Sequence, residues 1–184
     1  MTQRPHAYQD LVMLFNDCFF ETYNTRLVKG DLEPVYLPAS DICPYHQIVF
    51  AHGYFSSALH EISHWLIAGA DRRLKEDYGY WYCPDGRTAV EQVLFEQVEV
   101  KPQAIEWVLS QAADHRFYVS TDNLYGESTD NGAFKAAVYQ QVMLYAQDGL
   151  SERAQSFRVA LMDFYHTGDS NSLIDPSAFQ IEVI

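Results

Sequence analysis

Residues 48–69 read IVFAHGYFSSALHEISHWLIAG, and this stretch gives the clearest prediction of local structure in the chain. Its first three residues are apolar and β-branched or aromatic, which predicts a buried strand. Gly53 predicts a tight turn after the strand, and Ser56 or Ser57 can cap a following helix by accepting from its free backbone N–H groups. Gly69 can adopt the left-handed conformation that ends a helix. The stretch therefore predicts a strand, a turn and a helix of about three turns.

The rest of the chain predicts a small sheet and several more helices. Apolar residues recur at helical spacing from Tyr8 to Tyr23, and short β-prone runs separated by turn residues follow. The expected strands are residues 25–28, 34–37 and 47–51, and the later expected helices are residues 88–100, 131–147 and 151–166. We expect one compact α+β domain over residues 1–184, with the small sheet packed against the helices and a peripheral C-terminal tail from about residue 168.

Pro102 leaves two interpretations open for the region after residue 100. Proline removes a backbone donor, and it is tolerated in the first turn of a helix but disfavoured in the interior. Pro102 therefore either kinks the helix that begins near Thr88 or opens a separate helix from Gln103 to Ala113. The preceding charged and aromatic run, residues 72–85, predicts an ordered loop or hairpin.

Net charge and the distribution of apolar residues restrict the classes of function. Twelve Lys and Arg residues against 25 Asp and Glu residues give a net charge of −13. Such a chain repels phosphate backbones, so we expect no direct nucleic-acid binding. The N-terminus lacks the apolar segment of a signal peptide, and no run approaches the roughly 20 apolar residues of a membrane span. We expect a soluble, cytoplasmic protein that does not bind a membrane.

The run His60-Glu61-Ile62-Ser63-His64 predicts a metal site. Residues four apart lie on the same face of a helix, so both imidazoles point to a common ion at about 2.0 to 2.2 Å. Glu61 lies one position round the helix, close enough to hydrogen-bond a metal-bound water, and is the candidate catalytic residue. The predicted strand, turn and helix around the run disfavour a chance match. We therefore expect a divalent transition metal at the centre of the chemistry.

Two imidazoles do not complete a metal site, and we expect the third ligand to be a carboxylate from another element. Glu96 and Glu99 are the candidates, because residues three apart share a helix face and apolar neighbours indicate a packed segment. One would bind the metal while the other accepts a hydrogen bond from a ligating imidazole. The pattern alone does not assign these two roles. It also allows that both residues belong to a solvated acidic face of the helix. Glu91 is a weaker candidate.

Several longer blocks resemble the elongation factor P hydroxylase family. They are Tyr36–Ala39, Ile48–Gly53, His60–Trp65, Gly79–Arg87, Glu96–Ala104, Val119–Ser120 and Asp122–Leu124. The likeness extends from the first helix to about His166. It implies a cytoplasmic bacterial enzyme that hydroxylates the β-lysyl-modified lysine of elongation factor P, a translation factor. It also implies that His60, His64 and Glu99 bind the metal, which leaves Glu96 to support a ligating imidazole, within a fold likened to zincin-type hydrolases.

Ligand spacing does not separate three classes of metalloprotein. Iron held by two histidines and one carboxylate keeps three positions open for dioxygen and an electron source, whereas zinc has no redox chemistry. In a zinc hydrolase or peptidase, Glu61 would instead be the general base that deprotonates a metal-bound water. A closed structural zinc site would need a fourth ligand such as His46 or His52. The resemblance favours the hydroxylase with Fe(II), although zinc or another divalent metal could occupy the site; the sequence identifies no organic co-substrate.

Two further groups of residues have open roles. Trp65 and Tyr80–Tyr82 would either line a channel that receives the lysyl arm, gripping its ammonium groups by cation–π contact, or pack in the core. Asp122 and Asn123 would either face the pocket or form a local turn. Core packing is the favoured role for at least half of the aromatic residues.

Overall fold

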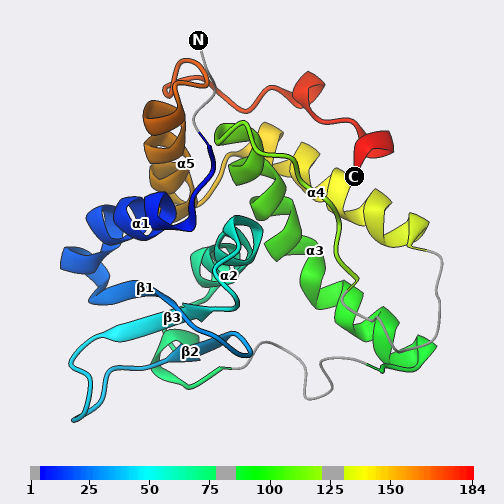
Figure 1. Cartoon of the computed structure of the whole chain (residues 1–184). Coiled ribbons are helices and arrows are strands. Elements are labelled where there is room, and N and C mark those ends of the chain that lie inside the picture. Colours follow the sequence, from blue (N-terminus) through cyan, green and yellow to red (C-terminus); the bar gives the residue numbers. More distant parts are fainter. Residues whose placement is uncertain (1–4, 78–85, 122–130) are drawn as a thin grey trace.

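The computed structural model describes residues 5–77, 86–121 and 131–184, and it places the small sheet at one edge of a group of helices (Figure 1). The predicted residues Tyr80–Tyr82, Asp122 and Asn123 lie outside the described ranges. In chain order the elements are α1 (Tyr8–Tyr23), β1 (Thr25–Lys29), β2 (Val35–Leu37), β3 (His46–Phe50), α2 (Phe55–Ile67), η1 (Arg72–Leu74), α3 (Ala89–Ala112), α4 (Gly132–Asp148), α5 (Glu152–Tyr165), η2 (Pro176–Ala178) and η3 (Ile181–Val183). The predicted α+β class is confirmed.

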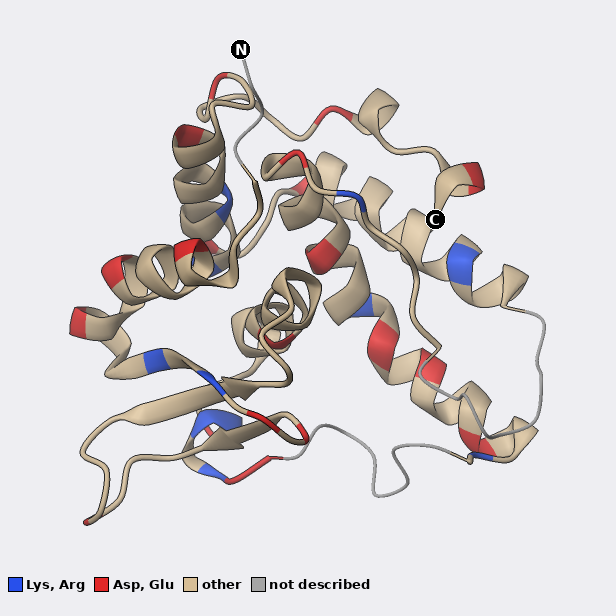
Figure 2. Cartoon of the chain, in the orientation of Figure 1, with Lys and Arg blue, Asp and Glu red and all other residues tan. Residues whose placement is uncertain are grey.

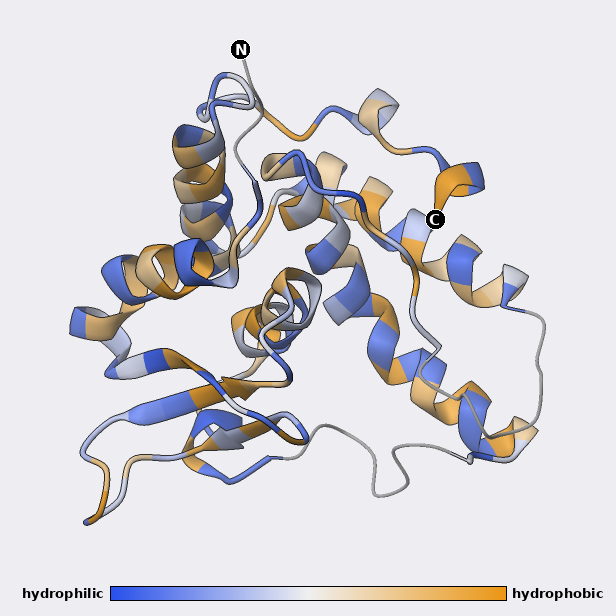
Figure 3. Cartoon of the chain, viewed as in Figure 1, coloured by the Kyte–Doolittle hydropathy of each residue, from blue (hydrophilic) through white to orange (hydrophobic). Residues whose placement is uncertain are grey.

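The sheet has the strand order β1-β3-β2, with β3 parallel to β1 and antiparallel to β2. β3 is the central strand; it begins with two polar residues and ends with the apolar run Ile48–Phe50, a change that Figure 3 shows by colour. Ile48 and Phe50 are buried against α1 and α2, which cover the sheet. Residues 72–77 contain η1 and a short bridge from Asp77 to Tyr36, so this part of the expected loop closes the β2 edge.

α2 begins and ends slightly differently from the prediction. Its N-cap is Tyr54 and no side chain caps it, so Ser56 and Ser57 lie inside the first turn. The helix starts early because Phe55 is buried and must already point into the core. At the other end Ala68 is extended, and Arg153 donates to the carbonyl oxygens of Trp65 and Ala68 at 3.0 and 2.7 Å. A cationic side chain therefore satisfies the last carbonyls, in place of a left-handed glycine.

α3 is one continuous helix of 24 residues, and Pro102 lies in its interior. Of the two interpretations, a separate helix from Gln103 is therefore wrong. The helix starts with a capping box, in which the Thr88 side chain accepts from the backbone of Glu91 and the Glu91 carboxylate accepts from the backbone of Thr88. Residues 102–110 are all buried, so tertiary packing on every side compensates for the backbone hydrogen bond that proline removes.

Two hydrophobic clusters share α3. The first lies between the sheet, α1, α2 and α5, and is dominated by aromatic rings such as Phe15, Trp65 and Phe157. The second lies between α3, α4 and the C-terminal segment, which contributes three buried side chains, Ile174, Phe179 and Ile184. The tail expected from about residue 168 runs along the periphery in Figure 1 and adds to this second cluster.

Among the described residues, no helix is both long enough and apolar enough to cross a membrane.

Candidate metal centre

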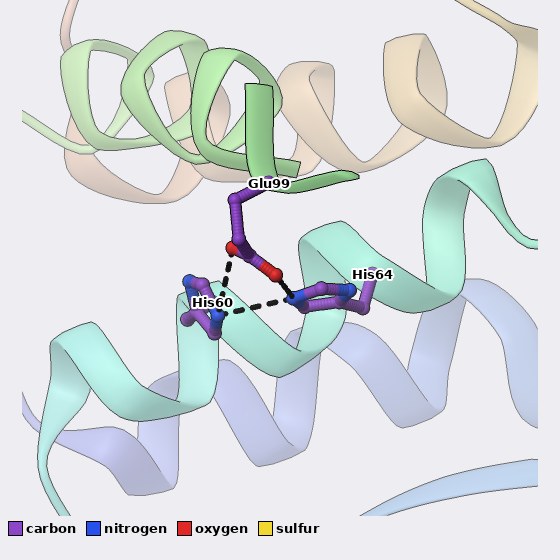
Figure 4. A group of neighbouring side chains, drawn as sticks. All are labelled: His60, His64 and Glu99. Atoms are coloured by element: carbon purple, nitrogen blue, oxygen red, sulfur yellow. Dashed lines mark hydrogen bonds and ion pairs between the residues drawn. The ribbon is translucent and has the colours of Figure 1, made fainter. Parts of the chain in front are cut away.

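Two imidazoles meet on the face of α2 that is turned toward α3. His60 and His64 are one helical turn apart, and their Nε2 atoms lie 3.1 Å from each other (Figure 4). Neighbouring positions on the other sides of the helix, Leu59, Ile62 and Leu66, are fully or almost fully buried in the first core. The apolar faces of α2 therefore fix the helix and hold the two histidines toward a common point.

Glu99 enters from α3 and completes a group of three potential ligands. One of its carboxylate oxygens lies 3.2 Å from His64 Nε2 and the other lies 3.6 Å from His60 Nε2. Its side chain is almost completely buried, and Figure 4 shows it descending from α3 onto the two rings. One ligand atom from each residue lies within 4.8 Å of the other two, in a group that consists of His60, His64 and Glu99 among the described residues.

These distances fit a divalent metal ion. With bonds of about 2.1 Å, two ligand atoms on one ion are about 3.0 Å apart in an octahedron and about 3.4 Å apart in a tetrahedron. The observed separations of 3.1, 3.2 and 3.6 Å, of which the last two run to different oxygens of Glu99, lie close to these values. Two neutral imidazole nitrogens and one carboxylate oxygen suit iron as well as zinc. The residues present therefore fit a metal, and the geometry leaves its identity open.

Glu106 is a functional candidate that the sequence analysis missed. Its carboxylate lies 2.8 Å from Nδ1 of His60, the ring nitrogen that points away from Glu99. The omission follows from Pro102: in a helix interrupted there, positions 99 and 106 belong to different elements. In one continuous helix, residues seven apart lie on the same face. The i, i+7 spacing from Glu99 was the available signal.

Glu96 occupies a different place from the expected one. It accepts a hydrogen bond from the side chain of Gln92 at 3.1 Å, and the carboxylate beside a ligand imidazole is Glu106. The reason is angular: at 3.6 residues per turn, position 96 is displaced by about 60° from position 99, whereas position 106 is displaced by only about 20°. Glu91 belongs to the capping box at the start of α3.

Gln103 supports Glu99 one turn further along α3. Its Nε2 lies 3.4 Å from a carboxylate oxygen of Glu99 and donates to the Ser120 carbonyl at 2.7 Å. Its Oε1 accepts from the Ser120 backbone N–H at 3.0 Å. Because both ends of the amide are paired with one backbone residue, the orientation of the amide is fixed and its N–H group faces Glu99. This side chain also links the site to the segment after α3.

Buried carboxylates shape the electrostatics of the site. Burial by itself would lower the pKa of His60, but Glu106, Glu99 and Glu61 raise it to about 10. Burial would likewise raise the pKa of Glu99, but His64 and His60 hold it at about 2. The pKa of Glu61 is raised, chiefly by burial. The acidic positions along α3 and α2 (Figure 2) thus create a negative potential that a bound cation would neutralise.

A small cavity of about 50 Å³ adjoins His64 on the side of the sheet. Its lining includes Glu61 and His64 as well as the charged residues Arg72, Arg73 and Asp77. Trp65, for which the sequence allowed either a channel or a core position, both borders the cavity and packs against Phe15. The complete lining is Tyr36, Ile48, Glu61, His64, Trp65, Ala68, Arg72, Arg73 and Asp77. A substrate group that enters this cavity would contact the imidazole of His64 directly.

The other histidines considered as a fourth ligand lie outside the group. His46 accepts a hydrogen bond from the Ala39 backbone N–H at 3.0 Å and stacks on Tyr36, and His52 lies beside Tyr54 at the end of β3. In the part of the chain that the structure describes, the group that could hold a metal consists of three residues. An arrangement of three ligands keeps coordination positions free for small molecules, which is typical of catalytic sites.

Fold and site together define a single-domain α+β protein with an open candidate metal centre of two histidines and one carboxylate. The sequence model of the family described as elongation factor P hydroxylase matches residues 14–173. The elongation factor P lysine hydroxylase of Haemophilus influenzae is 56% identical over 168 residues, which is 91% of this chain and 94% of that protein. The chain therefore belongs to the elongation factor P hydroxylase family.

Proposed function

We propose that this protein is an iron-dependent oxidoreductase that hydroxylates the β-lysyl-modified lysine of elongation factor P with dioxygen. The observation that carries the proposal is the open group of His60, His64 and Glu99 in a chain that is 56% identical to an elongation factor P lysine hydroxylase. Translation factors work in the cytoplasm, so we place the reaction there.

His60, His64 and Glu99 would hold the metal on one side and keep the opposite side open. When bound there, ferrous iron would supply a redox-active centre and the open coordination positions that dioxygen activation requires. The chain's own contribution is to orient the ligands: α2 fixes the imidazoles by its apolar faces, and Gln103 holds the Glu99 carboxylate. Glu61 lies beside the ligands at the cavity and would orient water or substrate groups there.

The modified lysyl arm is long, flexible and cationic. The apolar wall of the cavity beside His64 suits the methylene groups of such a chain, while the cations Arg72, which is paired with Asp77, and Arg73 line the same cavity. Tyr36, Ile48 and Trp65 provide apolar and aromatic walls for methylene groups, and Glu61 provides an acidic group near the metal. An electron source in addition to iron is required for turnover, and we assign no organic co-substrate to the described residues.

The decisive experiment uses elongation factor P that carries β-lysyl-lysine. Protein purified without oxygen is loaded with Fe(II), mixed with the modified factor and a reductant such as ascorbate, and exposed to air, and the factor is then measured by mass spectrometry. We expect a gain of one oxygen atom that requires both iron and air. Zinc-loaded protein and a His64→Ala variant serve as controls and should give no gain. An equal gain with zinc, or none with iron, would contradict the proposal.

A zinc hydrolase is the second candidate, because Glu61 lies beside the ligand group as a general base would. In that case the zinc-loaded protein would cleave peptides and the iron-loaded protein would leave the mass of the factor unchanged. The two candidates thus predict opposite results for the same two preparations.

A further inference from the structure

Glu106 is a buried acid to which the proposed function assigns no role. Its side chain is nearly excluded from solvent, and its neighbours in the sequence, Ile105 and Trp107, are buried in the two hydrophobic clusters. A buried carboxylate is unfavourable unless a partner compensates the lost hydration. Among the described residues, the carboxylate of Glu106 contacts Nδ1 of His60 at 2.8 Å.

This contact decides the tautomer of His60. An ionised carboxylate only accepts hydrogen bonds, so Nδ1 must carry the proton that is shared with Glu106. In the neutral ring the lone pair then lies on Nε2, because the two ring nitrogens divide these roles. Nε2 is the atom that lies 3.1 Å from His64 and 3.6 Å from Glu99. Glu106 therefore turns the binding nitrogen of His60 into the candidate metal centre.

The arrangement is part of a buried polar stripe on α3. The buried polar residues of this helix are Gln92, Glu99, Gln103, Glu106 and Ser110. At 3.6 residues per turn, all five positions fall within about 60° of one another around the helix axis. A helix that buries its polar face is inverted relative to a surface helix. Two members of the stripe, Gln103 and Glu106, hold one ligand each, Glu99 and His60.

We propose that Glu106 is a positioning residue of the metal centre, which fixes His60 in its Nδ1–H form and in the ring orientation that presents Nε2 to the metal. The inference rests on the proposed role of His60 as a metal ligand, and it is independent of the identity of the metal and of the substrate. Glu106 acts through His60 and contacts neither the metal nor the substrate.

The test compares metal binding by three variants of the full-length protein. Co(II) serves as the probe, because its visible absorption reports ligand geometry and its affinity is measured by competition with a chelator. Glu106→Leu removes both the charge and the acceptor, and Glu106→Gln keeps an acceptor of the same shape without the charge. Glu96→Gln is the matched control, since it removes one negative charge from the same helix at a residue paired with Gln92.

We expect Glu106→Leu to lose about 10- to 100-fold in Co(II) affinity and to change the absorption bands, because the imidazole is free to rotate. Glu106→Gln should lose less affinity and keep the bands, while Glu96→Gln should match the wild-type protein. Far-ultraviolet circular dichroism verifies folding, and if Glu106→Leu does not fold, the isosteric Glu106→Gln variant decides the question through its affinity alone.

Two results would overturn the inference, and they are distinguishable. If wild-type protein binds Co(II) but both Glu106 variants bind it with wild-type affinity and bands, Glu106 has no positioning role and the metal centre stands. If wild-type protein and a His64→Ala variant bind Co(II) equally, the metal centre itself is wrong, and the roles of His60 and Glu106 fall with it.

Discussion

Glu61 distinguishes the two enzyme classes that share this ligand arrangement. It directly follows the candidate ligand His60 and lines the cavity beside His64, and burial raises its pKa. A hydrolase needs this carboxylate to take the proton of the attacking water, so its removal would abolish turnover. In a hydroxylase the same group only orients its neighbours.

We therefore expect Glu61→Gln to keep the metal and to retain hydroxylation of modified elongation factor P, reduced by about 10- to 100-fold. Initial rates of the mass gain measure the effect, and metal analysis of the variant verifies occupancy. Peptide cleavage by the zinc-loaded wild-type protein that disappears in Glu61→Gln would support the hydrolase instead.

If His60 binds a metal as proposed, protonation and metal binding compete at its ring. In the metal-free protein the pKa of His60 is raised from 6.5 to about 10, so the ring keeps a proton that a metal must displace. Glu99, whose pKa is about 2, is already ionised near neutral pH. We expect the apparent metal affinity to rise by roughly tenfold per pH unit between pH 6.5 and 10, with one proton released. Chelator competition at several pH values measures this slope, and a flat profile would contradict it.

The stability of the metal-free protein should follow the opposite trend. A group whose pKa is raised on folding stabilises the folded state where it is protonated. The contribution of His60 is therefore fully present below pH 6.5 and is lost as the pH rises toward 10. Urea denaturation in the presence of a chelator measures the free energy of unfolding. His60→Gln is the control and should remove most of the slope between pH 6.5 and 10.

At the scale of elements, the site depends on α3 being one unbroken helix. Glu99 lies before Pro102, and Gln103 and Glu106 lie after it, yet all three belong to the same buried stripe. A break at Pro102 would separate the ligand from the side chains that hold the site together. Packing of residues 102–110 on all sides keeps the helix intact and so preserves the register between α3 and α2.

Gln103→Glu tests this coupling with a nearly isosteric change. The new carboxylate would face the Ser120 carbonyl and the Glu99 carboxylate, where the amide N–H group now lies. We expect a loss of about 1 to 3 kcal/mol in unfolding free energy, because a buried acceptor is left unpaired, together with weaker metal binding. Gln97→Glu, the same charge change at an exposed position of α3, is the matched control. Equal effects at the two positions would show that charge alone is responsible.

At the scale of the whole molecule, the two hydrophobic clusters meet at α3. Packing in the second cluster therefore helps to stabilise the helix that carries Glu99. The C-terminal segment closes the second cluster by packing Phe179 edge-on against Trp107, with ring centroids 5.2 Å apart. The segment lies far along the chain from the metal ligands, and its contribution is to the stability of α3 and α4.

Phe179→Ala should therefore lower the unfolding free energy by about 3 to 5 kcal/mol, since it deletes a buried ring and leaves a cavity. Leu173→Ala, at a side chain that is 86% exposed in the same segment, should change it by less than about 0.5 kcal/mol. Urea denaturation of both variants measures the difference. Similar values for the two would show that the segment is only loosely attached.

The sequence by itself determined the elements and part of the metal group. Periodicity located α1, the three strands, α4 and α5 to within about a residue, because apolar spacing reports directly which face each element buries. The four-residue spacing of His60 and His64 placed both rings on one face of α2, since that is a local property of any helix. The family resemblance selected Glu99, which the structure brings to both imidazoles.

Only the tertiary structure decided which residues surround these ligands. Whether α3 continues through Pro102 depends on packing from α2, α4 and α5, which no local pattern contains, and Glu106 was missed for that reason. The caps of α2 depended in the same way on buried Phe55 and on Arg153, which is 85 residues beyond Ala68 in the chain. Helix periodicity is set by bonds between near neighbours, whereas partners across a core are set by how whole elements pack.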